Sequence, residues 1–107
     1  MSVEELFAAL SARVVAEDDA VEQGPIMRST GLKTGGKFFA FARSGELVVK
    51  LPAARVAELV ASGDGGPFVG SRDRVMREWV VLRPPDERAC AAWVDEARAF
   101  AASRAGT

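Results

Sequence analysis

Residues 24–51 constrain the fold most, because short apolar runs alternate there with glycine-containing turns. The segment reads GPIMRSTGLKTGGKFFAFARSGELVVKL. Gly35-Gly36 separates two of the runs, and glycine accepts the positive φ of a two-residue hairpin turn. Ser44-Gly45 makes the next turn. The pattern predicts antiparallel strands at about 25–29, 37–42 and 47–51, with residues 31–33 either beginning the second strand or forming a bulge.

Helix signals flank this meander. Ser2 and Glu5 form an S-x-x-E capping box, which predicts a helix ending near residue 15 or 16. Pro52 suits the first turn of a short second helix, and Gly63 should end it. Residues 74–82 (RVMREWVVL) predict a fourth strand, after a flexible glycine-rich loop at 63–70 anchored by Phe68. Asp86 is expected to cap a last helix, whose buried face would carry Ala89, Cys90, Trp93, Ala97 and Phe100.

The predicted fold class is therefore α+β, in the element order α-β-β-β-α-β-α. We expect a two-layer domain with a mainly antiparallel sheet of about four strands and three helices. The chain has 107 residues, which suits a single domain spanning 1–107, with a frayed tail at 103–107. The run KFFAFA is too apolar for a strand with one solvent-exposed face, so both of its sides should be covered by other parts of the chain.

Composition argues against catalysis. The chain contains no histidine, which removes the commonest general base and metal ligand. Its single cysteine, Cys90, allows no internal disulfide and is predicted to be a small core residue. The glycines of 63–70 match no phosphate-binding motif, and the acidic residues of 17–22 lack the spacing of a calcium loop. We therefore predict no enzyme activity, no catalytic residue, no cofactor and no metal site.

Charge is balanced overall but unevenly placed. The net charge is −1, yet residues 23–83 carry ten basic and five acidic side chains, while residues 1–22 carry six acidic and one basic. Either the two regions neutralise each other, in the fold or in a dimer, or the middle region forms a basic binding face. Without a signal peptide or a membrane-spanning apolar run, the chain is expected to be cytoplasmic, with no membrane partner.

Four stretches in order carry a family resemblance: GPIMRSTGLK, KFFAFA, LVVKLP and RVMREWVVL. Together with the last helix and its Trp93, they resemble the N-terminal domain of the TfoX (Sxy) family, which is linked to regulation of DNA-uptake competence. The resemblance covers nearly the whole chain and is to a stand-alone form without the family's helical C-terminal domain. Met27-Arg28-Ser29 departs from the family's usual Met-Phe-Gly. The family's regulatory role is not carried across on half of its architecture, and the family pattern assigns no catalytic residue.

Lys50 is the most informative single residue, because it interrupts the apolar run LVVKL. Its ammonium group could reach solvent or pair with a carboxylate such as Glu78. Alternatively, Lys50 could join an anion-binding cluster. The candidate residues for anion or partner binding are Arg28, Lys33, Lys50, Arg77 and Trp79.

Three functional hypotheses follow. The first is a non-enzymatic regulatory or protein-interaction domain, for which a protein partner or self-association is expected. The second is a DNA-binding domain that uses the basic meander, which the balanced net charge and the 7% aromatic content disfavour. The third is a small-anion-binding domain centred on Lys50.

Overall fold

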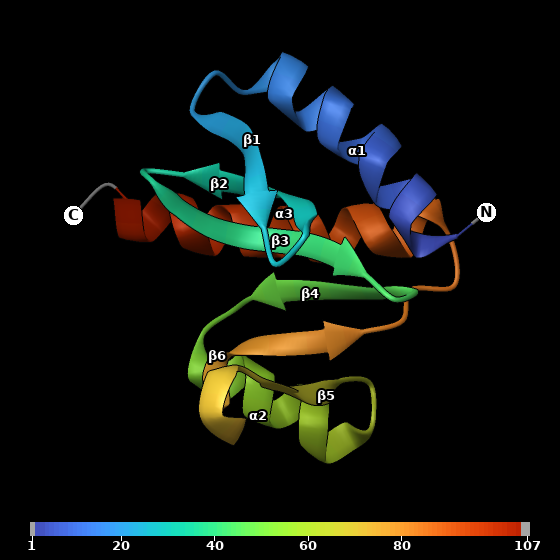
Figure 1. The fold of residues 1–107 in the computed structure, drawn as a ribbon, viewed down its shortest axis with the longest axis vertical. Helices are drawn as coiled ribbons and strands as arrows, with labels where there is room; N and C mark the ends of the chain where they lie inside the picture. Colours follow the sequence, from blue (N-terminus) through green and yellow to red (C-terminus); the bar gives the residue numbers. More distant parts are fainter. Residues whose placement is uncertain (1, 106–107) are drawn as a thin grey trace.

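The computed structural model describes residues 2–105 and places helices on a curved antiparallel sheet (Figure 1). In chain order the elements are α1 (Val3–Glu17), β1 (Val21–Ile26), β2 (Ser29–Thr34), β3 (Lys37–Arg43), β4 (Glu46–Lys50), α2 (Ala53–Ser62), β5 (Gly66–Val69), the 3₁₀ helix η1 (Ser71–Asp73), β6 (Val75–Leu82) and α3 (Glu87–Ala105). Among the described residues, none of these helices is long and apolar enough to cross a membrane.

The sheet has the strand order β1-β2-β3-β4-β6-β5, and every neighbouring pair is antiparallel. This confirms the α+β class and the predicted order of helices and strands. The sheet contains six strands, however, and not about four. One additional strand arises because the chain reverses within the first predicted strand, and the other lies in the segment read as a loop.

The first difference arises at Met27 and Arg28. Both residues have positive φ, 47° and 65°, so the chain reverses there and the strand expected at 25–29 divides into β1 and β2. The second difference is β5, which lies inside the segment read as a flexible loop. Phe68 does anchor that segment, as expected, and its burial holds the short strand against β6.

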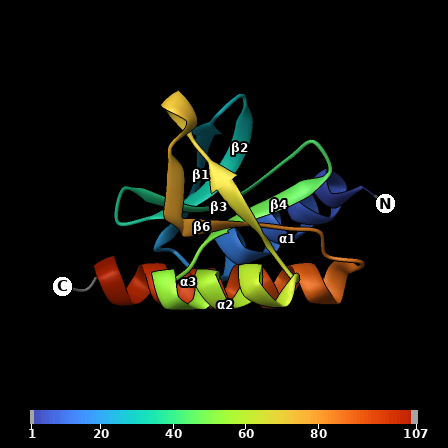
Figure 2. The same cartoon turned by 90° about the horizontal axis from the view of Figure 1, so that it is seen from below.

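All three helices pack on one face of the sheet, an arrangement that the sequence left open (Figure 2). The main core lies between these helices and strands β3, β4 and β6. Leu10 of α1, Leu59 of α2 and Val94 of α3 are buried against it. A salt bridge of 2.9 Å between Arg55 Nε and Glu96 Oε2 joins α2 to α3. The helices therefore form one layer and the sheet the other.

A smaller core covers the opposite face at the middle of the sheet. Phe41 and Val48 are buried there with Phe68, and Ile26, Trp79 and Val81 pack around them. The pairing of β2 with β3 skips Phe39, a β-bulge that leaves this residue and Ala40 buried in the main core. Both sides of KFFAFA are thus covered, as predicted.

Local capping signals behave as the sequence indicates. The backbone N–H of Glu5 donates to Ser2 Oγ at 3.1 Å, and the Ser2 N–H donates to Glu5 Oε1 at 3.2 Å, completing the capping box. Gly63 ends α2 in the left-handed conformation, with φ of 86°. Asp86 Oδ1 accepts a hydrogen bond of 2.9 Å from the Ala89 N–H at the start of α3. Helix α3 continues to Ala105, so it includes the first three residues of the tail predicted to fray; residues 106–107 lie outside the described part.

Candidate anion-binding pocket

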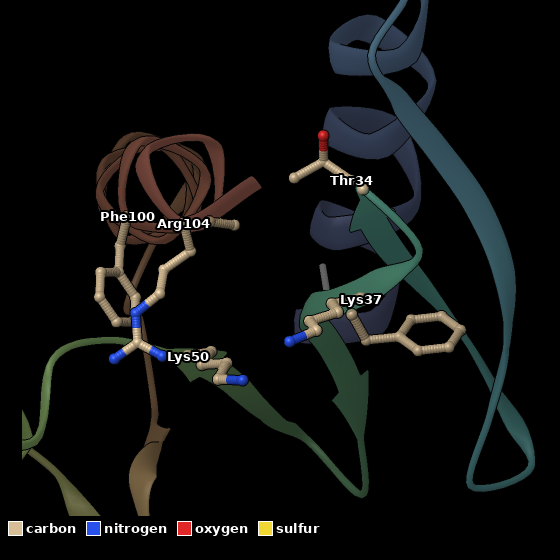
Figure 3. Close-up of a pocket in the computed structure, with 8 residues that line it drawn as sticks. Thr34, Lys37, Lys50, Phe100 and Arg104 are labelled. Atoms are coloured by element: carbon tan, nitrogen blue, oxygen red, sulfur yellow. The ribbon is translucent and has the colours of Figure 1, made fainter. Parts of the chain in front are cut away.

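A pocket of about 400 Å³ opens where the β2–β3 turn, the end of β4 and the last turns of α3 meet (Figure 3). Three segments far apart in the sequence build it. Its lining consists of Thr34, Gly35, Lys37, Phe38, Lys50, Phe100, Ala101 and Arg104.

Lys50 reaches this pocket because it is the last residue of β4. Leu47 and Val49 point into the main core, while Val48 and Lys50 alternate to the other side. Lys50 is half-buried, and Figure 3 shows its ammonium group directed toward that of Lys37. Among residues 2–105, no carboxylate lies within ion-pair distance of either lysine.

The expected alternative, a pair between Lys50 and Glu78, is wrong. Glu78 Oε2 instead accepts a hydrogen bond of 2.8 Å from Arg104 Nη2. The guanidinium carbon of Arg104 also lies 4.9 Å from the centre of the Phe100 ring. Figure 3 shows this guanidinium between Phe100 and Lys50. Helix α3 thus supplies the cation that pairs with Glu78.

The electrostatic consequence is an excess of positive charge around one concavity. Glu78 balances Arg104, whereas Lys37 and Lys50 face each other without a counter-charge among the described residues. Charges of the same sign repel each other, and an anion is attracted to both. An anion placed between them would remove this repulsion and gain two charge-assisted hydrogen bonds.

Part of the remaining lining is apolar. Phe38, Phe100 and Ala101 contribute carbon surface, and Phe100 belongs to neither core cluster. Thr34 turns its hydroxyl away, because Oγ1 donates a hydrogen bond of 2.9 Å to the carbonyl of Ala20. The pocket therefore combines cationic donors with hydrocarbon walls.

Of the residues predicted to form an anion site, only Lys50 lines this pocket. Arg28 lies in the exposed β1–β2 turn. Lys33 places its ammonium 5.6 Å from the Phe38 ring centre, and Arg77 lines a separate groove beside α2. Trp79 packs 5.7 Å from Phe41 in the smaller core. Trp79 is nevertheless the cross-strand partner of Lys50 in the pairing of β4 with β6. The structure does not bring Arg28, Lys33 or Arg77 to the pocket.

Sequence reasoning missed three lining residues that matter, Lys37, Phe100 and Arg104. A signal for Lys37 was present, since a lysine directly after the Gly35-Gly36 turn begins β3 at the sheet's end. Arg104 was assigned to a frayed tail, and Phe100 to the core face of α3. Phe100 belongs to neither core cluster, and Arg104 lies in the last turn of α3.

A second concave surface lies between α2 and the first half of β6. Its volume is about 280 Å³, and its lining is almost entirely apolar. Val60, Val75 and Met76 line it and are 39%, 56% and 36% exposed. Arg77 borders this α2–β6 groove. Exposed apolar surface of this kind marks interaction sites.

Catalytic groups are scarce in the described part of the chain. Cys90 is fully buried, and this burial raises the pKa of its thiol, as does the nearby Glu87 carboxylate to a smaller extent. A buried thiol with a raised pKa is a poor nucleophile. Among residues 2–105, no group of three or more His, Cys, Asp or Glu side chains could hold a metal ion.

Comparison with protein-family models, curated proteins and solved structures finds no match for this chain.

Proposed function

We propose that this protein is a non-enzymatic binding domain whose ligand is a small anion held between Lys37 and Lys50. The observation that carries this proposal is the convergence of the two ammonium groups on one pocket without a carboxylate between them. A ligand of opposite charge placed between the two ammonium groups would be attracted to both.

The chemistry of the pocket suits recognition more than turnover. Lysine and arginine side chains donate hydrogen bonds and neutralise charge, but they do not accept a proton near neutral pH at their ordinary pKa values. The chain contains no histidine, and its one thiol is buried. A bound anion would join the end of α3 to β3 and β4. The ligand would therefore act as an effector that stabilises one arrangement of the domain.

Denaturant unfolding with and without inorganic phosphate tests the proposal. A ligand that binds only the folded state stabilises it by about 2.7 kcal/mol at a concentration 100-fold above its Kd. We expect phosphate to raise the unfolding midpoint at constant ionic strength, and Lys50→Met to abolish this gain. An equal gain in Lys50→Met would show that phosphate acts elsewhere or nonspecifically.

The matched control is Arg28→Asn. This variant removes one positive charge from the exposed β1–β2 turn, and asparagine tolerates the positive φ found there. We expect Arg28→Asn to keep the full phosphate-dependent gain. A short DNA duplex in the same titration tests the DNA-binding hypothesis, because binding through phosphates weakens steeply with salt.

A second candidate function is partner binding through the α2–β6 groove. It is favoured by the exposed apolar side chains of Val60, Val75 and Met76, with Arg77 at the border. These features fit a partner whose binding segment carries apolar residues next to acidic ones. Sedimentation of the wild type and of Met76→Asp would test the simplest case, a second copy of this chain. A concentration-dependent dimer that the substitution dissociates would support it, and an equally stable dimer would contradict it.

A further inference from the structure

We infer that the pocket selects an aromatic phosphate monoester over inorganic phosphate and over hydroxyl-rich sugar phosphates. This inference rests on the proposed function, because it assigns a ligand class to the same pocket. Three features of the lining carry it: the number of uncompensated charges, the apolar walls and the lack of acceptor side chains.

The charge count indicates a dianion. Glu78 is committed to Arg104, which leaves Lys37 and Lys50 as the two cations without a counter-charge among the described residues. A phosphate monoester carries a charge of about −1.5 to −2 at neutral pH and offers three strong acceptor oxygens. A carboxylate supplies only half of that charge. The phosphate group thus matches the two ammonium groups that point toward each other in Figure 3.

The walls indicate an aromatic body. Phe38 and Phe100 line the pocket and are only partly buried, although both are large apolar side chains. The pocket's volume of about 400 Å³ falls within the range of sites that hold whole organic ligands, roughly 300–1,000 Å³. Room therefore remains beside the phosphate, next to aromatic rings that a planar ligand would cover. Aromatic pairs favour offset or edge-to-face contact, which these rings can provide.

The polar groups of the lining argue against a sugar. The eight lining residues include no carboxylate and no side-chain amide, and the Thr34 hydroxyl is engaged with the carbonyl of Ala20. The hydroxyl groups of a ribose or hexose would lose their hydrogen bonds to water and would contact the carbon atoms of the pocket wall instead. Unpaired hydroxyl groups in such a site weaken binding. Sugar phosphates should accordingly gain little over phosphate itself.

Calorimetric titration of the intact chain at constant ionic strength tests this selection. The probes are 1-naphthyl phosphate, 1-naphthoate, ribose 5-phosphate and inorganic phosphate. We expect 1-naphthyl phosphate to bind at least about tenfold tighter than each of the other three. Phe100→Ala should reduce this preference to about threefold or less. Phe100→Leu, which keeps an apolar wall, should retain part of the preference, and Lys50→Met should weaken both phosphates.

The outcomes separate the inference from the proposed function. Equal affinity for naphthyl and inorganic phosphate, with both lost in Lys50→Met, would overturn the aromatic selection and leave the anion site standing. Tighter binding of ribose 5-phosphate, or of 1-naphthoate, would also overturn it. Absence of binding by all four probes would overturn both proposals.

Discussion

Replacing Phe41 with alanine tests whether the helix-free face of the sheet is a packed core. Phe41 is 1% exposed, and its ring lies 5.9 Å from that of Phe68, edge to face, and 5.7 Å from that of Trp79. Truncating a buried phenylalanine to alanine costs about 3–5 kcal/mol. A domain of this size has a total stability of about 5–15 kcal/mol, so the loss would be a large fraction of it.

Urea unfolding followed by far-UV circular dichroism and by tryptophan fluorescence measures this loss. Trp79 lies in the affected cluster, so its emission should also shift in the folded state of the variant. The matched control is Phe38→Ala, which removes the same side chain from the same strand but outside both core clusters. We expect the control to cost less than about 1 kcal/mol, as is typical away from the core.

The reasoning would be refuted if Phe41→Ala destabilised the protein by no more than Phe38→Ala. A double-mutant cycle refines the test. The variants Phe41→Leu and Phe68→Leu should show a coupling energy of about 0.5–1.5 kcal/mol, the usual range for an aromatic pair. Coupling near zero would mean that the two rings do not touch in solution.

Three further predictions concern the helices. Trp93 is half-buried beside the main core, and the Arg55 guanidinium lies 5.5 Å from its ring centre. Trp93→Ala should therefore lower the free energy of unfolding in urea by about 2 kcal/mol, which is less than the loss for a fully buried ring. No measurable loss would contradict this packing. Ser2→Ala should cost about 1 kcal/mol through the lost cap. Hydrogen bonds from the Ser2 backbone and hydroxyl lower the pKa of Glu5 below its ordinary 4.5, so their stabilising effect is complete above pH 4.5 and is lost as pH falls through the lowered value. The difference in free energy of unfolding between wild type and Ser2→Ala should therefore become smaller as the pH falls. A difference that does not change with pH would argue against the capping box. Finally, Cys90 should react with a thiol reagent only as fast as the protein unfolds, because its thiol is buried and its pKa is raised; rapid labelling of the native protein would contradict this.

The candidate site was only partly predictable, and the reason is one of sequence distance. Lys50 could be singled out because a charged residue inside an apolar run is a local anomaly. Lys37 and Arg104 could not be joined to it, since they lie on β3 and near the end of α3 and meet Lys50 only through the packing of α3 on the sheet. One of the alternatives for Lys50, a pair with Glu78, is wrong for the same reason. The partner of Glu78 comes from the last turn of α3, 26 residues away along the chain.

What the sequence determined by itself is local: the capping box at Ser2, the Gly35-Gly36 hairpin, the left-handed end of α2 at Gly63 and the α+β class. Each depends on backbone preferences or hydrogen bonds within a few residues, so each can be recognised from the local sequence without knowing which other helix or strand packs against it. Tertiary structure decided the strand order, the division into six strands, the second core around Phe41 and the pocket around Lys50. Strand pairing and pocket assembly depend on contacts between distant segments, whose free energy is gained only when the whole sheet and its helices have packed.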